Sequence, residues 1–408
     1  MRDLIRRTFR SLRVRNFRLF FIGQFVSSVG LWMQQVAEMW LIAEITGSGA
    51  AVGLITVTHF GPVLLFGLWG GVVADRLDKR KILFVTQTLL GVIAAALAIV
   101  SATGGVTVGI LYGFSAVTGL VQALDNPTRR AFVREMVDQS DVSNAVSLVS
   151  MVFTSSRIVG PALTGVLLVT TGPTIVFAVN AVSYLGVLVA LLMMSVKDLN
   201  RTPPVPKARG QLLEGLHYAW VTTGVRMPLL MMGWIGTLAF NFSVLLVLFA
   251  EDTFNGGPGS YGTLLSLSAI GSVSGAVASA TRRVITRRFL VSAAIGFGVV
   301  TIIASTAPTL ITMSLLLIPV GLFGVSFLAG AQGAMQAAAA PHMQGRVMAL
   351  FAVVFLGGTP IGGMVAGLVA EAWGPRLAFA LGGCVSLLVG LWAWLVGRVG
   401  PTKPISTV

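Results

Sequence analysis

The sequence contains few charged residues and few of the side chains that build metal or redox sites. Charged residues make up 10% of its 408 positions, whereas 55% are hydrophobic and the mean hydropathy is +0.89. A soluble domain has roughly a quarter of its residues charged, so a soluble globular protein is excluded. A single cysteine excludes an intrachain disulfide, and three scattered histidines form no metal motif. We therefore expect neither a cofactor nor a metal.

Several sequence patterns are also absent. The chain has no G-x-x-x-x-G-K-[ST] phosphate loop, so ATP is not bound in the usual way, and it has no H-E-x-x-H metal motif. Its apolar runs are unbroken rather than alternating with polar residues, which excludes a porin-like β-barrel. We expect a protein that is not an enzyme and that takes its energy from a gradient.

Long hydrophobic runs dominate what is present. A bilayer core is crossed by about 20 helical residues, and twelve runs of about this length can be placed in the chain. They cover residues 19–44, 51–73, 82–102, 106–125, 143–169, 174–196, 228–250, 261–280, 289–306, 309–331, 345–370 and 376–397. The sequence thus predicts an all-α integral membrane protein with twelve transmembrane helices.

The net charge of +14 comes from a one-sided distribution of basic residues. All 28 lysines and arginines except Arg157 and Arg376 fall on the side of the N-terminal segment. By the positive-inside rule that side is the cytoplasm, and an even number of spans places both termini there. We expect a multi-pass protein of the cell (inner) membrane that binds no nucleic acid. The basic start of the chain, residues 1–18, anchors the first span or lies on anionic lipid as a surface helix.

The chain reads as two halves. A polar, proline-bearing stretch at 197–227 separates an N-terminal half (1–196) from a C-terminal half (228–408), and it contains a predicted surface helix around 211–222. The fifth and sixth runs align without a gap with the eleventh and twelfth. The aligned pairs include Phe153 with Phe355, Gly160 with Gly362, Gly165 with Gly367, Gly172 with Gly374 and Pro173 with Pro375. We infer a duplicated six-helix unit, which is typical of transporters whose halves rock around a midplane site.

The loop after the second run, GGVVADRLDKRKIL, resembles the cytoplasmic signature G-x-x-x-D-R-x-G-R-K of the major facilitator superfamily. The matching residues are Gly71, Asp75, Arg76, Lys79 and Arg80. Asp78 stands where glycine is usual. The resemblance implies that Asp75 is the acid of a cytoplasmic gate and that the three bases are its partners. The corresponding loop of the second half has Ser279 in the place of the acid.

A second motif lies in the fifth run. RIVGPALTG carries Gly160, Pro161 and Gly165 and resembles a degenerate form of the antiporter motif G-P-x-x-G-G, with Thr164 in the place of one glycine. Close helix packing is the alternative explanation. The fourth run lacks the arginine that the superfamily often carries there. With PTRRAFVREMV and SNAVSL, the segment resembles the enterobactin-exporter and macrolide-efflux-like branch, which implies export of small amphipathic molecules.

Three charged side chains fall inside or at the edge of predicted spans and are our candidates for proton coupling: Glu38, Asp125 and Arg157. A charge at the centre of a helix costs about 2.5–3.5 kcal/mol on insertion scales, so such residues are functional candidates by default. We hypothesise that Glu38 is protonated from outside and releases its proton inward as substrate exchanges. The alternatives are that Glu38 lies at the outer surface or pairs permanently with Arg157.

Polar residues at helical spacing, together with the family's lining spans (first, fourth, seventh and tenth), give candidates for the substrate cavity. These are Gln24, Gln34, Tyr112, Ser115, Gln122, Trp234 and Asn241. A polar stripe in an apolar helix must face protein or water, since lipid accepts no hydrogen bonds. Simple helix packing remains an alternative for the hydroxyl side chains.

The function predicted from the sequence is secondary active export of small amphipathic molecules, either drugs or siderophore-like compounds, by proton antiport with alternating access. Two alternatives remain open: translocation of a lysophospholipid or other lipid, and uptake of a nutrient by symport. The expected partners are the small-molecule substrate, protons and membrane lipid, and the expected oligomeric state is a monomer.

Overall fold

The computed structural model describes residues 9–200, 211–282, 285–340 and 343–399. These residues are almost wholly helical and contain no β-strand. The predicted surface helix at the start of the chain is only partly covered: a short 3-10 turn, η1, spans Arg10–Arg13, and residues 1–8 lie outside the described residues.

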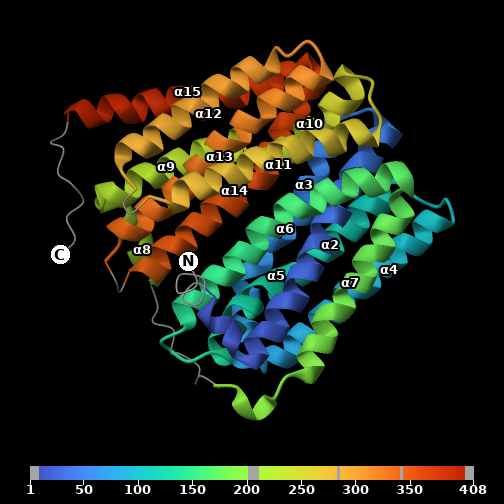
Figure 1. Cartoon of the computed structure of the whole chain (residues 1–408), viewed down its shortest axis with the longest axis vertical. Helices are drawn as coiled ribbons and strands as arrows, with labels where there is room; N and C mark the ends of the chain where they lie inside the picture. The colour runs from blue at the N-terminus through green and yellow to red at the C-terminus, as the bar shows by residue number, and fades with distance from the viewer. Residues whose placement is uncertain (1–8, 201–210, 283–284, 341–342, 400–408) are drawn as a thin grey trace. The chain divides into compact units, whose positions relative to one another are not determined.

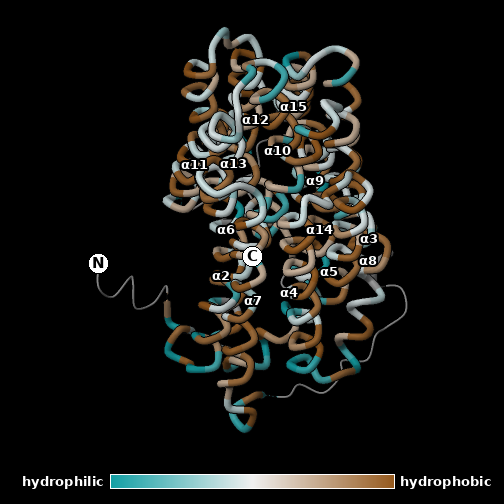
Figure 2. Tube along the Cα trace, turned by 90° about the vertical axis from the view of Figure 1, so that its right-hand side faces the viewer, coloured by the Kyte–Doolittle hydropathy of each residue, from teal (hydrophilic) through white to brown (hydrophobic). Residues whose placement is uncertain are grey.

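Each predicted span corresponds to a helix, with the seventh built in pieces. In the first half the helices are α2 (Arg15–Thr46), α3 (Gly49–Arg76), α4 (Lys79–Ala102), α5 (Val108–Met136), α6 (Val142–Thr170) and α7 (Pro173–Met193), followed by the 3-10 turn η2 (Val196–Asp198). In the second half they are α9 (Thr223–Leu238), α10 (Phe242–Leu248), α11 (Pro258–Ala280), α12 (Arg287–Ser305), α13 (Leu310–Ala338), α14 (Gln344–Trp373) and α15 (Pro375–Val399). Helix α8 (Gln211–Val221) is the predicted surface helix of the linker. Figure 2 shows these helices as largely hydrophobic along their length. The predicted fold class, an all-α integral membrane protein, is confirmed.

Among the described residues, eleven stretches are long and apolar enough to cross a membrane. Helix α2 is not among them although it has 32 residues. The reason is its buried polar stripe, which includes Gln24, Gln34 and Glu38 and lowers its hydropathy. A helix of that length spans about 48 Å, which is more than a bilayer core requires. We therefore treat α2 as the first of twelve spans.

The seventh span differs from the unbroken helix that we predicted. Residues 239–241 interrupt it between α9 and α10, and a π-turn, η3 (Phe249–Thr253), ends it. At the interruption the Asn241 side chain donates Nδ2 to the carbonyl oxygen of Thr237 at 2.8 Å. In a regular helix the backbone N–H of residue 241 would take that carbonyl, so the side chain replaces a backbone bond.

The chain forms two compact units. The first comprises Met1–Leu41 and Gly61–Pro206, and the second comprises Ile42–Phe60 and Lys207–Val408. The division at 206/207 falls inside the predicted linker. Residues 42–60, which we assigned to the N-terminal half, pack with the second unit, where Glu371 accepts hydrogen bonds from Ser48 Oγ at 2.6 Å and Ala50 N at 2.8 Å.

Inside each unit, glycines set close helix contacts. In the first unit α4 lies along α7 (Figure 1), and a Cβ on Gly91 would lie 3.3 Å from Tyr184 Cβ. In the second unit α12 lies along α15, and a Cβ on Gly298 would lie 2.5 Å from Leu387 N. The single cysteine, Cys384 of α15, is exposed.

The duplication seen in the sequence is also visible in the backbone conformation. Gly172 and Gly374 have φ values of +80° and +87°, and each precedes a proline that begins a helix. Only glycine adopts this conformation without strain, which explains why the Gly-Pro pair recurs.

Candidate functional site

Glu38 lies in a buried hydrogen-bonded network in the first unit. Its side chain is 1% exposed, and Gln34 Nε2 donates to Glu38 Oε1 at 2.7 Å. Asn180 Nδ2 of α7 donates to Gln34 Oε1 at 2.6 Å, and Ser183 Oγ donates to Asn180 Oδ1 at 3.2 Å. A Cβ on Gly30 would lie 2.4 Å from Asn180 Oδ1, so this glycine lets α2 and α7 approach. The alternative that Glu38 lies at the outer surface is therefore wrong.

Arg157 lies on α6 against α2. Its guanidinium carbon lies 5.5 Å from the centre of the Trp32 ring, a cation–π arrangement, and Phe153 meets the same ring edge-on at 5.8 Å. Gly160 makes room, since a Cβ there would lie 2.7 Å from Trp32 Cβ. The structure thus places the Arg157 side chain against α2, the helix that carries Glu38. Pairing between the two charges stays a prediction.

The antiporter-like motif forms the contact between α6 and α2. Thr164, which stands where the motif has glycine, donates to Gly160 O at 2.9 Å and across the helices to Met33 O at 3.3 Å. Gly165 is buried, and α6 continues as a helix through Pro161. Both packing and motif explanations remain compatible with this geometry.

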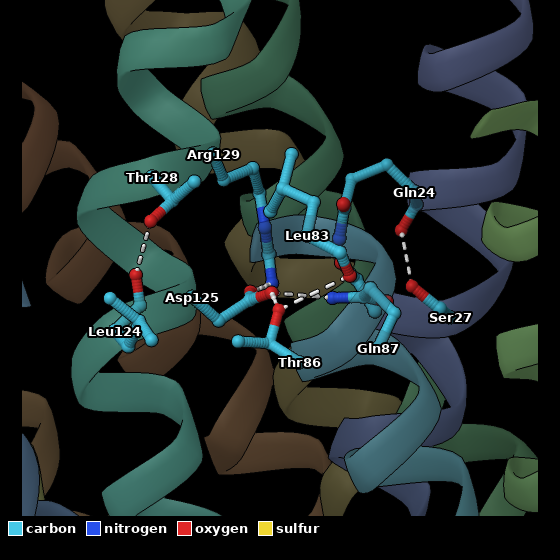
Figure 3. Close-up of polar contacts among 10 residues, drawn as sticks. Gln24, Ser27, Leu83, Thr86, Gln87, Leu124, Asp125, Thr128 and Arg129 are labelled. Carbon is cyan, nitrogen blue, oxygen red and sulfur yellow. Dashed lines mark hydrogen bonds and ion pairs between the residues drawn. The ribbon is translucent and has the colours of Figure 1, made fainter. Parts of the chain in front are cut away.

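Asp125 of α5 is the centre of a second polar cluster (Figure 3). Its side chain is fully buried, accepts from Thr86 Oγ1 at 2.7 Å and from Gln87 Nε2 at 2.8 Å, and forms an ion pair with Arg129 one turn along α5. In Figure 3 the Gln24 side chain points from α2 toward this cluster. A buried carboxylate needs such compensation, because an unpaired charge is costly to bury.

The gate motif joins α3 to α4 through a tight turn. Asp78, which departs from the family pattern, is the N-cap of α4 and accepts from the backbone N–H groups of Arg80 at 3.0 Å and Lys81 at 3.2 Å. Aspartate is a preferred N-cap, so the departure stabilises the helix start. Asp75 and Arg76 end α3 with exposed side chains. A Cβ on Gly71 would make an ordinary 3.9 Å contact, whereas one on Gly70 would lie 2.0 Å from Ala123 O, so Gly70 carries the close packing.

Two of the motif's bases have partners other than the acid we assigned. Lys79 Nζ lies 2.7 Å from Glu135 Oε1 of α5, and Arg80 donates through Nε and Nη2 to the carbonyl oxygen of Leu191, at 2.8 and 2.6 Å. The latter bonds satisfy a free carbonyl in the last turn of α7. Their role as partners of Asp75 in a gate stays a prediction.

The candidate cavity residues are only partly brought together. In the first unit Gln24 and Ser115 are buried, and neither Gln24 Oε1 nor Ser115 Oγ has a hydrogen-bond partner among the described residues. Gln122 is buried and Tyr112 is half-buried, both on α5. In the second unit Asn241 is buried at the break of the seventh span, whereas Trp234 is 60% exposed.

Sequence reasoning missed the groups that hold the two acids. These are Thr86, Gln87 and Arg129 at Asp125, and Asn180, which acts through Gln34, at Glu38. A lone amide in an apolar run, such as Asn180 in VFAVNAVSY, is a usable signal because lipid cannot satisfy it. Which acid each group serves depends on contacts between helices, which the sequence does not contain.

The second unit contains an aromatic cluster where its chain is interrupted. Phe240 lies 5.2 Å from Phe297, 6.4 Å from Phe327 and 6.4 Å from Phe355, measured between ring centres. Phe242 lies 6.0 Å from Phe379. We call these six residues the phenylalanine cluster. Such rings offer an apolar, polarisable surface of fixed shape.

Comparison with known proteins agrees with this architecture. Residues 6–406 match the family model described as transmembrane secretion effector. The staphyloferrin A transporter of Staphylococcus aureus is 22% identical over 257 residues, which cover 63% of this chain and 64% of that protein. Macrolide efflux protein A of Streptococcus pyogenes is 22% identical over 390 residues, which cover 92% of this chain and 95% of that protein.

A solved structure shows the same fold. A bacterial homologue of the human lysosomal transporter Spinster, in an inward-facing and occupied conformation, has a TM-score of 0.74 at 14% identity and covers 94% of this chain and 96% of that chain. With the family match over nearly its whole length, the chain belongs to the transmembrane secretion effector family of the major facilitator superfamily and is a multi-pass, non-enzymatic membrane transporter of small molecules.

Proposed function

We propose that this transporter exports small amphipathic molecules, either drugs or siderophore-like compounds, in exchange for protons. The observation that carries the proposal is the burial of Glu38, a carboxyl group 1% exposed inside a span and hydrogen-bonded to Gln34. Intramembrane carboxyl groups held in this way commonly serve proton relays. The relatives whose names mention macrolide efflux and a siderophore support the direction and the substrate class.

The cycle rests on a change in the charge of Glu38. A carboxylate accepts a stronger hydrogen bond from Gln34 than a neutral acid does. Protonation from outside weakens this hydrogen bond, and release of the proton to the inside restores it. Alternating access between the halves then links each proton to one substrate movement.

The proposal includes the orientation of the chain. The protein lies in the cell (inner) membrane. Both termini lie in the cytoplasm, because the basic loops lie on that side of the membrane. Residues 1–196 and 228–408 act as the two halves, with 197–227 as the linker. The transporter works as a monomer surrounded by lipid.

The test uses proteoliposomes and a radiolabelled macrolide, with an imposed pH gradient. Wild type accumulates the macrolide against its gradient, whereas Glu38→Gln loses gradient-driven transport, because the amide does not titrate. Glu44→Gln is the matched control, since Glu44 is an exposed acid near the end of the same helix. Full activity of Glu38→Gln overturns proton antiport through this residue. Transport of a fluorescent lysophospholipid without macrolide transport would instead favour the lipid translocator, and gradient-driven uptake of a nutrient would favour the symporter.

A further inference from the structure

Arg157 lies in the middle of α6, where a charged side chain cannot reach the membrane surface. It follows Val142 by fifteen residues and precedes Thr170 by thirteen, so it lies about 20 Å from each end of α6. An arginine keeps its charge in proteins, and a charge at this depth faces protein or water rather than lipid. The partly exposed Arg157 side chain therefore lies on a surface of the first unit that is turned away from lipid.

Two aromatic rings lie beside this cation. The guanidinium carbon of Arg157 lies 5.5 Å from the centre of the Trp32 ring, and Phe153, one turn earlier on α6, meets that ring edge-on at 5.8 Å. Phe153 is 44% exposed, and Trp32 is partly exposed. We call these three residues the Arg157 patch. It combines a fixed positive charge with accessible aromatic surface.

The Arg157 patch and the Glu38 network use different sides of α2. Gln34 and Glu38 lie one turn apart on α2, and Gln34 accepts a hydrogen bond from Asn180 of α7. Trp32 comes two residues before Gln34, which is a rotation of about 200° around the helix. The Trp32 ring accordingly meets α6, where Arg157 lies. The patch is therefore a separate feature with a role of its own to explain.

The corresponding place in the second unit shows that helix packing does not require this cation. At the offset of the duplication, Phe153 and Arg157 correspond to Phe355 and Thr359. Phe355 keeps an aromatic contact, since its ring centre lies 6.4 Å from that of Phe240. Thr359 Oγ1 donates only within its own helix, to Phe355 O at 3.1 Å. The aromatic contact is thus common to both units, whereas the cation is an addition in the first.

We propose that the Arg157 patch binds the carboxylate of an amphipathic substrate whose apolar ring packs on Trp32 and Phe153. A guanidinium presents its N–H donors in a fork that matches a carboxylate, and aromatic rings offer apolar surface of fixed shape. This inference deepens the proposed function and rests on it for the direction of transport. Siderophore-like acids are then the preferred substrates, whereas molecules without an acidic group, macrolides included, bind through the rings alone.

The test compares two radiolabelled probes that share a dansyl ring and a six-carbon chain. One ends in a carboxylate and the other in a carboxamide. Scintillation proximity measures their binding to the full chain in detergent, without any gradient. Wild type binds the carboxylate at least about tenfold more tightly, because a hydrogen bond to a charged group contributes roughly this much. Arg157→Gln and Arg157→Met each remove the preference by weakening carboxylate binding alone.

Two further variants serve as controls. Arg376→Gln removes an arginine of the second unit whose Nη1 donates to Ser305 O at 3.3 Å, and it leaves both affinities unchanged. Phe153→Leu weakens both probes by a similar factor, because it removes ring surface and no charge. Equal affinities of the two probes in wild type, or an unchanged preference in the Arg157 variants, would overturn the site. Equal loss of both probes in both Arg157 variants would show a structural role and would overturn it as well.

A lipid phosphate could use the same guanidinium fork, so unlabelled lysophosphatidate is added as a competitor. Stronger displacement by lysophosphatidate than by the unlabelled carboxylate probe would overturn the assignment to a carboxylate substrate. The two proposals fail separately, because binding without a gradient does not depend on the protonation cycle of Glu38. Equal probe affinities in a transporter that needs Glu38 defeat only the Arg157 site. An intact preference together with full macrolide transport by Glu38→Gln defeats only proton antiport at Glu38.

Discussion

In the first unit Arg80 donates to the carbonyl oxygen of Leu191, and in the second Arg287 donates to that of Ala393. In the first unit Gly160 packs on Trp32 of α2, and the Trp32 ring contacts the ring of Phe153. In the second unit Gly362 packs on Thr237 of α9, and the ring of Phe240, three residues further along the chain, contacts the ring of Phe355. The two units therefore share the contacts that hold their helices together. The duplication has preserved these helix–helix contacts.

The polar chemistry differs between the units at corresponding positions. Counting from Trp32 and Phe240, Gln34 and Glu38 correspond to Phe242 and Leu246. At the offset that brings Gly172 onto Gly374, three further pairs correspond: Asp125 with Phe327, Asn180 with Gly382, and Tyr184 with Ser386. The first unit thus carries Asp125 and Gln34, the partner of Glu38, where the second carries Phe327 and Phe242 of the phenylalanine cluster. The same helix–helix contacts therefore accommodate either polar or aromatic side chains at these positions, because the arginine and glycine contacts that hold the helices together do not involve those side chains.

The largest expected effect tests whether the acid must be in the first unit. Glu38→Gln should lower gradient-driven macrolide transport by at least about tenfold, and adding Leu246→Glu in the second unit should not restore it, since no Gln34 or Asn180 equivalent is present there. Proteoliposome transport measures both variants, with Leu246→Met as the control for repacking. Recovery of transport in the double variant would show that the two positions are interchangeable.

The second prediction compares Asp125 with Phe327. Asp125→Leu should destabilise the protein by about 3–5 kcal/mol, because Arg129 is left buried without its partner. Phe327→Leu should cost about 1 kcal/mol, a typical value for a single substitution. Adding Arg129→Leu to Asp125→Leu should recover most of the loss. Unfolding in detergent, followed by tryptophan fluorescence, measures all of these, and equal costs for both single variants would contradict the comparison.

The third prediction concerns the shared skeleton. Gly160→Ala and Gly362→Ala should each destabilise by about 1–3 kcal/mol, which is the usual cost of overpacking. The effect at Gly362 should be larger, since its Cβ would lie 1.6 Å from the carbonyl oxygen of Thr237, whereas a Cβ on Gly160 would lie 2.7 Å from Trp32 Cβ. Thermal unfolding measures both. Gly109→Ala is the control, because nothing lies within 4 Å of its Cβ position; a loss at Gly109 of the same size would undermine the argument.

The smallest expected effect is at the two arginines. Arg80→Gln and Arg287→Gln should each lower stability by about 1 kcal/mol or less, because each loses its hydrogen bonding to one carbonyl oxygen of a neighbouring helix. Arg288→Gln serves as the control, being an exposed neighbour on α12. Thermal unfolding should give similar shifts for the first two variants. A loss confined to Arg80 would show that its gate motif has a role that its counterpart in the second unit lacks.

Much of the fold can be predicted from the sequence, because long apolar runs form helices that cross the bilayer. Span positions, the linker helix and the Gly-Pro junctions are all local signals. The interruption at residues 239–241 is not visible in hydropathy, because phenylalanine on both sides keeps the run apolar. It depends on a side chain, Asn241, that takes over a backbone bond.

The candidate site is predictable only in part. Glu38 is found from the cost of placing a carboxyl group in a membrane, but its partners are not, since Asn180 reaches Gln34 only because Gly30 lets two distant helices approach. Asp78 gives a second example. The family signature has glycine at this position, so the motif shows only that Asp78 differs, whereas the preference of aspartate for N-cap positions explains its local role at the start of α4. Motif comparison therefore identifies positions more readily than it identifies partners.

The phenylalanine cluster has a consequence for how this transporter would evolve. Apolar side chains of similar volume replace one another at a cost that is usually below about 1.5 kcal/mol, whereas one lost partner of a buried acid costs more. Mutations that reshape the cluster are therefore tolerated more readily than mutations around Glu38 or Asp125. Substitutions should therefore accumulate first around Phe240, Phe327 and Phe355, so variation among strains would be concentrated in the second unit.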